Sequence, residues 1–295
     1  METTVREIEV VSETQNDKIN SIPTIKSLIK ETVLWYKKNF KTIFNIFFIP
    51  AILMVPLVFF DSVNDTSNGY FGTNAKFIGA ALAIVFILQA FLNIVATIGF
   101  IKKVPTFKTI TPHWIDVYKD GLKFLIPFVL VGIIQFLVVF SGFVLLIIPG
   151  LILSFYFVFS MYALMIDDKK GIDALVHSAH LIRSNLFSVA IRLIVLGFLT
   201  TLIIVLATIL VNMLTFYLPG ILPDFMISIS SPFVELIVLS PMIVIYNNIM
   251  YEALSKNSKE IEKPREIKYK KVIKALMILS GVFIATIVIL FISFA

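Results

Sequence analysis

The 295-residue chain is 58% hydrophobic and only 15% charged, with a mean hydropathy of +0.95, whereas soluble domains are about half apolar and a quarter charged. This composition excludes an ordinary soluble protein, and the absence of cysteine excludes disulfides, thiolate catalysis and cysteine-based metal sites. In so apolar a chain, a formal charge of +6 predicts contact with anionic lipid and a sidedness of the loops, not nucleic-acid binding.

The chain begins with two segments that are too polar to cross a membrane. Residues 1–22 are polar, with several glutamates, and are predicted to form a flexible cytoplasmic tail. From Pro23 to Phe40, apolar residues including Trp35 and Tyr36 recur at helical spacing, while lysines occupy the other side. This pattern is typical of an amphipathic helix at the membrane surface.

Seven apolar, charge-poor segments follow, most of them near the roughly twenty residues that a bilayer requires. The predicted spans are 42–60, 77–100, 124–146, 151–166, 187–214, 233–250 and 272–294. Pro149-Gly150 is the preferred turn between the third and fourth spans, because proline stops a helix and glycine tolerates positive φ, and Ser141-Gly142 is the alternative. The prediction is an all-α polytopic bundle of three hairpins plus a C-terminal span. A six-span membrane domain occupies 23–256, and a basic cytoplasmic linker with the seventh span occupies 257–295.

Two further amphipathic patterns precede the second and third hairpins. One begins at Thr111-Pro112, which resembles an N-cap followed by proline at the first helical position. The other begins near Lys170 and places Asp173, His177 and His180 on its polar face. These three helices indicate a weak internal repeat, although any loop between two spans could lie on the membrane surface in this way.

The basic residues predict the orientation of the chain. All of the 25 lysines and arginines except Lys76 fall before the first span, in every second connection after it or, for Arg192 and Lys274, at the adjoining end of a span. The positive-inside rule therefore places the N-terminus in the cytoplasm and, with seven spans, the C-terminus outside. The richness in isoleucine, lysine, phenylalanine and asparagine is typical of an AT-rich prokaryotic genome, so we expect a prokaryotic plasma membrane.

Short motifs in the second half of the chain give a family resemblance. A Pro-Gly pair precedes an aromatic-rich span, an Ala-Leu-x-x-Ser-x-x-Leu pattern follows, and an Asn stands before an aromatic residue. A proline and a tyrosine mark the sixth span. The residues concerned are Pro149, Gly150, Ala174, Leu175, Ser178, Leu181, Asn185, Phe187, Pro241 and Tyr251. They resemble the membrane domain of some bacterial glycerophosphodiester phosphodiesterases and the related uncharacterised YciC-like membrane proteins.

The resemblance covers about residues 110–256 and departs from the family pattern at Ser184, where the family has glycine. It implies a six-span membrane domain with an appended seventh span. It does not imply phosphodiesterase activity, because that enzyme uses a separate soluble barrel for which this chain has no counterpart.

Polar residues inside the spans are the candidate functional groups, because such residues are costly in lipid. Gln89, Asn93, Gln135 and Glu235 could line a polar site near the midplane, or they could form hydrogen bonds that only fix helix packing. Arg192, at the inner end of the fifth span, could extend to the cytoplasmic surface.

No nucleophile–base pair, phosphate loop or complete set of metal ligands is recognisable, since His177 and His180, with Asp173 one turn earlier, have no third imidazole or thiolate nearby in sequence. We therefore expect a protein that is not an enzyme and needs no cofactor or metal. The preferred function is a lipid- or envelope-related scaffold or helper that contacts anionic headgroups. The alternative is a small transporter or channel, and an intramembrane enzyme is the least favoured.

Overall fold

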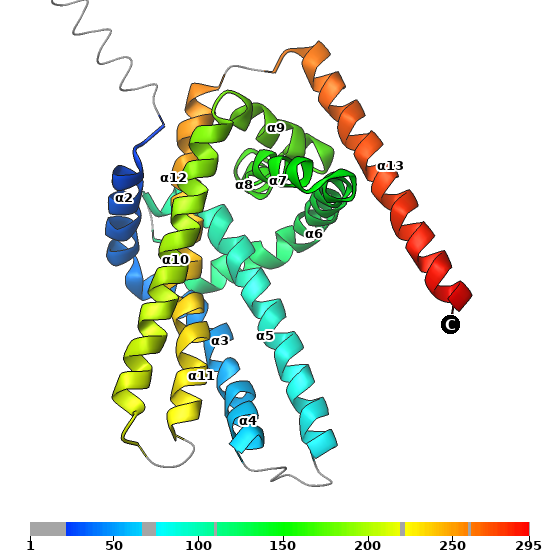
Figure 1. Ribbon diagram of the computed structural model, residues 1–295. Coiled ribbons are helices and arrows are strands. Elements are labelled where there is room, and N and C mark those ends of the chain that lie inside the picture. Colours follow the sequence, from blue (N-terminus) through cyan, green and yellow to red (C-terminus); the bar gives the residue numbers. More distant parts are fainter. Residues whose placement is uncertain (1–21, 67–74, 109–110, 219–221, 259–260, 295) are drawn as a thin grey trace, which may run out of the picture.

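The computed structural model describes residues 22–66, 75–108, 111–218, 222–258 and 261–294 (Figure 1). Within these ranges every regular element is a helix, and seven helical stretches are long and apolar enough to cross a membrane. The prediction of an all-α bundle with about seven spans is therefore confirmed. Nearly all of the predicted N-terminal tail, residues 1–21, lies outside the described residues.

The helices follow one another with short connections. In chain order they are α2 (Ile25–Lys38), α3 (Phe40–Ile52), α4 (Met54–Thr66), α5 (Ala75–Lys103), the 3₁₀ turn η2 (Val104–Lys108), α6 (Trp114–Leu145), α7 (Ile147–Tyr156), α8 (Ser160–Asp167), α9 (Ile172–Arg183), α10 (Leu186–Thr215), α11 (Leu222–Val234), the π-helical segment η3 (Glu235–Leu239), α12 (Ser240–Asn257) and α13 (Lys263–Phe294). Figure 1 shows α10 beside the continuous α11–α12 helix, and α13 leaning away from the other helices toward its C-terminal end.

Several spans extend beyond the predicted limits. The sixth is the clearest case, because α11, η3 and α12 form one helical stretch from Leu222 to Asn257, whereas the sequence predicted a connection up to Pro232. That prediction was wrong because a proline in the membrane does not end a helix when neighbouring groups satisfy the backbone.

The predicted turn at Pro149-Gly150 is also wrong. Helix α6 ends at Leu145, the extended residue Leu146 makes the turn, and Pro149 and Gly150 lie in the first turn of α7. Proline is accepted there because the first-turn N–H groups have no partner within the helix. A Cβ on Gly150 would lie 2.5 Å from the ring of Phe143, so this glycine permits the close packing of α7 on α6.

A glycine contact fixes the crossing of α5 and α6. A Cβ on Gly99 would lie 1.8 Å from the carbonyl oxygen of Val117, and a Cβ on Gly121 would lie 2.1 Å from that of Val95. Small residues allow the backbones of membrane helices to approach closely. No larger side chain could occupy either position without separating the two helices.

Two tyrosines compensate for prolines inside the spans. Pro50 cannot donate to the carbonyl of Ile46 and Pro241 cannot donate to that of Ile237, because proline has no N–H. The hydroxyl of Tyr118 donates to the Ile46 carbonyl at 2.7 Å, and that of Tyr36 donates to the Ile237 carbonyl at 3.0 Å. Each tyrosine comes from one of the predicted amphipathic segments, which are therefore built into the bundle.

The third predicted amphipathic segment, α9, has the same role at the break between α7 and α8. Ser178 is completely buried, and its hydroxyl donates to the Tyr156 carbonyl at 2.7 Å while accepting from the Phe159 N–H at 3.2 Å. These are backbone groups that the interruption at residues 157–159 leaves without helical partners. All three helices thus supply a hydroxyl to an interrupted span.

Helix α9 differs from its predicted position on the membrane surface. Seven of its residues between Ala174 and Ile182 are buried. One of them is Ser178, which the sequence pattern placed on neither the apolar nor the polar face of the helix. The predicted N-cap at Thr111 is likewise wrong. Helix α6 begins at Trp114, and His113 caps it by accepting from the N–H of Ile115 at 3.4 Å.

Candidate functional site

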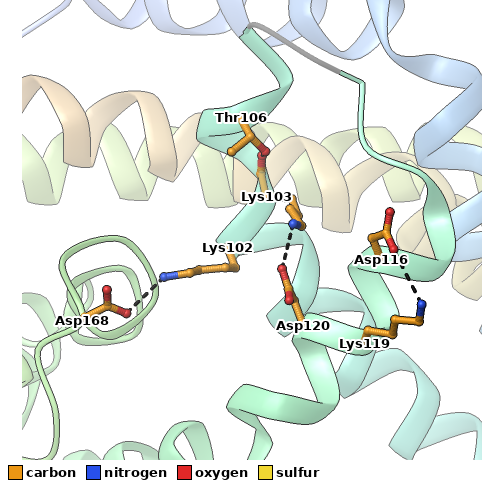
Figure 2. A network of polar contacts seen from close by, with 7 residues as sticks. All are labelled: Lys102, Lys103, Thr106, Asp116, Lys119, Asp120 and Asp168. Carbon is orange, nitrogen blue, oxygen red and sulfur yellow. Dashed lines mark hydrogen bonds and ion pairs between the residues drawn. The ribbon is translucent and has the colours of Figure 1, made fainter.

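Ion pairs connect the ends of several helices into one layer. Lys102 pairs with Asp168 at 3.1 Å and Lys103 with Asp120 at 2.9 Å, so that the end of α5 is tied both to the α8–α9 connection and to α6 (Figure 2). Lys270 of α13 pairs with Asp173 of α9 at 2.8 Å. We call these six residues the polar layer. All of them belong to segments that the basic residues predict to be cytoplasmic.

A buried aromatic group lies beside the polar layer. Tyr251 of α12 is 1% exposed, packs against the tilted rings of Phe159 and Tyr162, and donates its hydroxyl to the carboxylate of Asp167 at the end of α8. His177 Nε2 lies 3.1 Å from the same carboxylate oxygen, without the alignment of a hydrogen bond. Asp167 therefore holds together helices α8, α9 and α12.

The electrostatics of His177 follow from this burial. Desolvation lowers the pKa of His177, and the neighbouring Asp167 carboxylate opposes that effect only in part. The imidazole is therefore neutral at physiological pH, which makes its contact with Asp167 weaker than an ion pair. Among the described residues no three His, Cys, Asp or Glu side chains form a group that could hold a metal.

Two pockets flank α9 where α13 begins. The smaller, about 360 Å³, is polar and is lined by Lys169, Asp173, His177, His180 and Glu266 among others. Because acidic and basic groups are mixed there, it favours no charge on a ligand.

The larger pocket, about 640 Å³, lies between α7, α9 and α13 and has two chemically distinct parts. Arg183, Arg265 and Lys268 contribute cationic groups, whereas the remaining wall is mainly apolar and comes from the three helices. That wall includes Leu153, Phe157, Val272, Ile273 and Leu276. We call this space the amphipathic pocket. Neither its cationic side nor its apolar side was predicted from sequence, because α13 begins about eighty residues after α9 ends.

The predicted midplane residues occupy different surroundings. Gln89 is 5% exposed in α5, and Asn93 lies one helical turn further along the same helix. Gln135 of α6 lines a largely apolar pocket together with Phe136 and Met161, and Glu235 is an exposed residue at the start of η3. The side-chain amide oxygens of Asn93 and Gln135 are buried without a hydrogen-bond partner in the described part of the chain. Whether the four residues serve one ligand stays a prediction.

The motif residues have structural roles. Ala174, Leu175 and Leu181 are buried in α9 beside Ser178, and Asn185 is the N-cap residue of α10. Pro241 is buried at the start of α12, where it creates the free carbonyl that Tyr36 satisfies. Their pattern therefore reports how interrupted spans are supported, which sequence spacing alone did not indicate.

Arg192 lies in the second turn of α10, and its guanidinium contacts the chain that leads into α2. Its guanidinium donates to the carbonyl of Pro23 at 3.0 Å and to that of Ser188 at 2.8 Å. The hydroxyl of Tyr246 donates to the Arg192 backbone carbonyl at 3.3 Å. Arg192 thus anchors the segment before α2 to α10, and whether it also lies at the membrane surface stays a prediction.

Comparison with known proteins gives one match. The model of the domain of unknown function DUF7847 matches residues 71–254, from the connection before α5 to the end of α12. No curated protein and no solved structure matches the chain. The matched region includes α7, α9 and Tyr251, whereas α2, α3 and α13 lie outside it.

Proposed function

The chain belongs to the DUF7847 family, and we propose that it is a non-enzymatic integral protein of the plasma membrane that organises anionic lipid at the cytoplasmic face. The observation that supports this proposal is the polar layer, in which ion pairs join α5 to α6, α5 to the α8–α9 connection, and α9 to α13. The six charges of the layer neutralise one another, so the layer fixes the positions of helix ends whose other basic residues would face the lipid headgroups.

The charge of the predicted cytoplasmic segments agrees with this role. Helix α2 carries exposed lysines on its outer side, and basic residues continue along the first turns of α13. Each lysine or arginine near an anionic leaflet contributes about 1 kcal/mol of attraction. The exposed apolar side chains on α5, α10 and α13 provide the surface that acyl chains would contact.

The proposal includes the orientation, with the N-terminus in the cytoplasm and the C-terminus outside. The chain contains no cysteine, so single cysteines report cleanly on sidedness. We expect Tyr217→Cys and Lys256→Cys, both at exposed positions, to react with a membrane-impermeant thiol reagent from opposite sides of the membrane. Labelling of both from the same side would refute this topology.

A relationship to the membrane domain of glycerophosphodiester phosphodiesterases and YciC-like proteins also remains a proposal. It is supported by the Pro-Gly, Ala-Leu-x-x-Ser-x-x-Leu and Tyr251 patterns, each of which has a defined structural role in this fold. The structure of such a domain would be expected to contain a serine that supports an interrupted fourth span, and a continuous span there would argue against the relationship.

The lipid proposal is tested by comparing the lipid composition of a strain that lacks the protein with that of its parent, alongside uptake of a panel of small solutes. We expect an altered content or distribution of anionic phospholipid, restored by the wild-type protein. Unchanged lipids with normal uptake would overturn the lipid role and leave only a scaffold for other proteins.

The second candidate, a transporter or channel, is favoured by one observation. The side-chain amide oxygens of Asn93 and Gln135 are buried and have no hydrogen-bond partner among the described residues. Buried polar groups without partners are unusual and can mark a path that water or an ion enters. If this candidate is right, Asn93→Leu and Gln135→Leu abolish uptake of a solute while the lipid composition stays normal.

A further inference from the structure

The amphipathic pocket combines features that match one class of ligand. Its cationic groups Arg183, Arg265 and Lys268 come from α9 and from the first turns of α13, and its apolar wall lies further along α7 and α13. A molecule that satisfies both parts has an anionic group joined to a hydrocarbon chain. Cationic and apolar surfaces are arranged along α13 in the same order as the headgroup and acyl regions of a membrane leaflet.

The cations of the pocket are available for a ligand. In the described part of the chain, the side chains of Arg183 and Lys268 take part in no hydrogen bond or ion pair, and Arg265 has only a long contact of 3.8 Å with the exposed Glu262. Among the described residues that line the pocket, one acidic group therefore faces three basic groups. By contrast, Lys270, on the same helix, is already paired with Asp173 and Glu266.

The size and openness of the pocket identify which part of a lipid it would hold. A volume of about 640 Å³ falls in the range of about 300–1,000 Å³ found for small-molecule sites. Exposed apolar residues continue from the pocket along α7 and α13, including Leu151, Ile152 and Leu279. A phosphate-bearing headgroup and the first part of a chain would thus lie in the pocket, with the rest of the chain in the bilayer.

The surrounding aromatic groups agree with this location. Tyr156 and Tyr269 also line the pocket, and Tyr269 directly follows the cationic Lys268 in α13. Tyrosine is enriched at the level of lipid headgroups, where its ring is in an apolar region and its hydroxyl in a polar one.

We infer that the amphipathic pocket is a binding site for an anionic phospholipid, whose phosphate contacts Arg183 and Lys268 and whose acyl chain lies against Val272, Ile273 and Leu276. This inference rests on the proposed function and deepens it, because it assigns the lipid to one site and one class of headgroup. Helix α13, which lies outside the region matched by the family model, supplies half of the site.

The test uses the full chain in nanodiscs of phosphatidylcholine that contain a minor fraction of phosphatidylglycerol, and native mass spectrometry counts the phosphatidylglycerol retained after release from the disc. The double variant Arg183→Gln/Lys268→Gln removes the two unpaired cations. The matched control, Lys271→Gln/Lys274→Gln, removes the same charge from exposed positions of α13 that do not line the pocket. A third variant, Val272→Trp, fills the apolar part at a residue that is half exposed and so tolerates a larger side chain.

We expect the pocket double variant to retain phosphatidylglycerol about tenfold less well, as the loss of charge-assisted contacts implies, and the control to stay within about threefold of wild type. Val272→Trp should also reduce retention. Equal losses in the pocket variant and the control would overturn the site and leave only general attraction to the membrane surface. That result would not touch the proposed function, which depends on the lipid composition of the deletion strain.

A second arm distinguishes a lipid from free phosphate. Inorganic phosphate, or water-soluble glycerol phosphate, is added to the same nanodiscs in excess over phosphatidylglycerol. If the acyl chain contributes to binding, neither compound displaces the lipid and Val272→Trp remains defective. Full displacement by inorganic phosphate together with normal retention by Val272→Trp would show that the site recognises phosphate alone, and would overturn the inference.

Discussion

The hydroxyl of Ser178 is expected to support the interrupted fourth span, and Ser178→Ala tests this directly. The side chain is fully buried and serves two backbone groups, the carbonyl of Tyr156 and the N–H of Phe159. Alanine removes the oxygen while changing little of the packing volume. Both backbone groups then remain buried, where no new partner is available and water cannot easily enter.

The magnitude follows from the cost of unpaired polar groups. Each costs about 1–3 kcal/mol in protein interiors, whereas hydrogen bonds measured between membrane helices contribute less, about 0.6 kcal/mol on average. For the two groups together we expect the free energy of unfolding to fall by about 1–4 kcal/mol. Titration of the detergent-solubilised protein with a denaturing detergent, followed by circular dichroism, measures this change.

Ser154→Ala is the matched control for this prediction. Its hydroxyl also donates to a carbonyl at 2.7 Å, that of Leu151, but the acceptor is one turn earlier in the same helix α7. Removing it therefore leaves no backbone group unpaired, and we expect a change of less than about 0.5 kcal/mol. If both variants unfold at the same detergent fraction, the serine does not support the break and the reasoning is wrong.

Three further outcomes are expected. Tyr118→Phe removes the hydroxyl that pairs with a freed carbonyl in α3 and should lower the free energy of unfolding by about 1–3 kcal/mol, whereas Tyr217→Phe, at an exposed position, should leave it unchanged in the same titration. Gly99→Leu places a side chain against the α6 backbone and should abolish the monodisperse peak in size-exclusion chromatography; recovery equal to that of Gly197→Leu, at an open position, would contradict the observed crossing. For His177, whose pKa is lowered by burial, the unfolded state binds the proton more readily, so thermal stability should decline as the pH falls through about 6.5, and His177→Gln should remove that dependence.

The common feature of these sites is a hydroxyl that crosses from one helix to the backbone of another. Prolines and breaks in the spans free carbonyl groups that lipid cannot satisfy. Tyr36, Tyr118 and Ser178 satisfy three of them, and each comes from a segment that is amphipathic in sequence. The weak repeat of amphipathic segments therefore corresponds to a repeated structural role, in which each segment packs into the bundle.

The sequence by itself determined the class of the fold and the number of spans. Long runs without charge require a membrane, and their lengths are set by the thickness of the bilayer, so both follow from local composition. It also located the helices that carry Tyr36, Tyr118 and Ser178. Local composition could not identify the acceptors of their hydroxyls, because Ile237 is 201 residues from Tyr36 and Ile46 is 72 residues from Tyr118.

Only the tertiary structure decided how the breaks and the pockets are made. Pro149 was predicted to mark a turn, but a proline in the first turn of a helix does not end that helix. Pro149 lies in the first turn of α7, where the neighbouring Gly150 packs closely against Phe143 of α6. The amphipathic pocket is lined by both Arg183 and Lys268, which come from two helices that lie far apart in sequence. Charge and hydropathy patterns are read along one helix at a time, whereas a binding site depends on which faces of different helices come together.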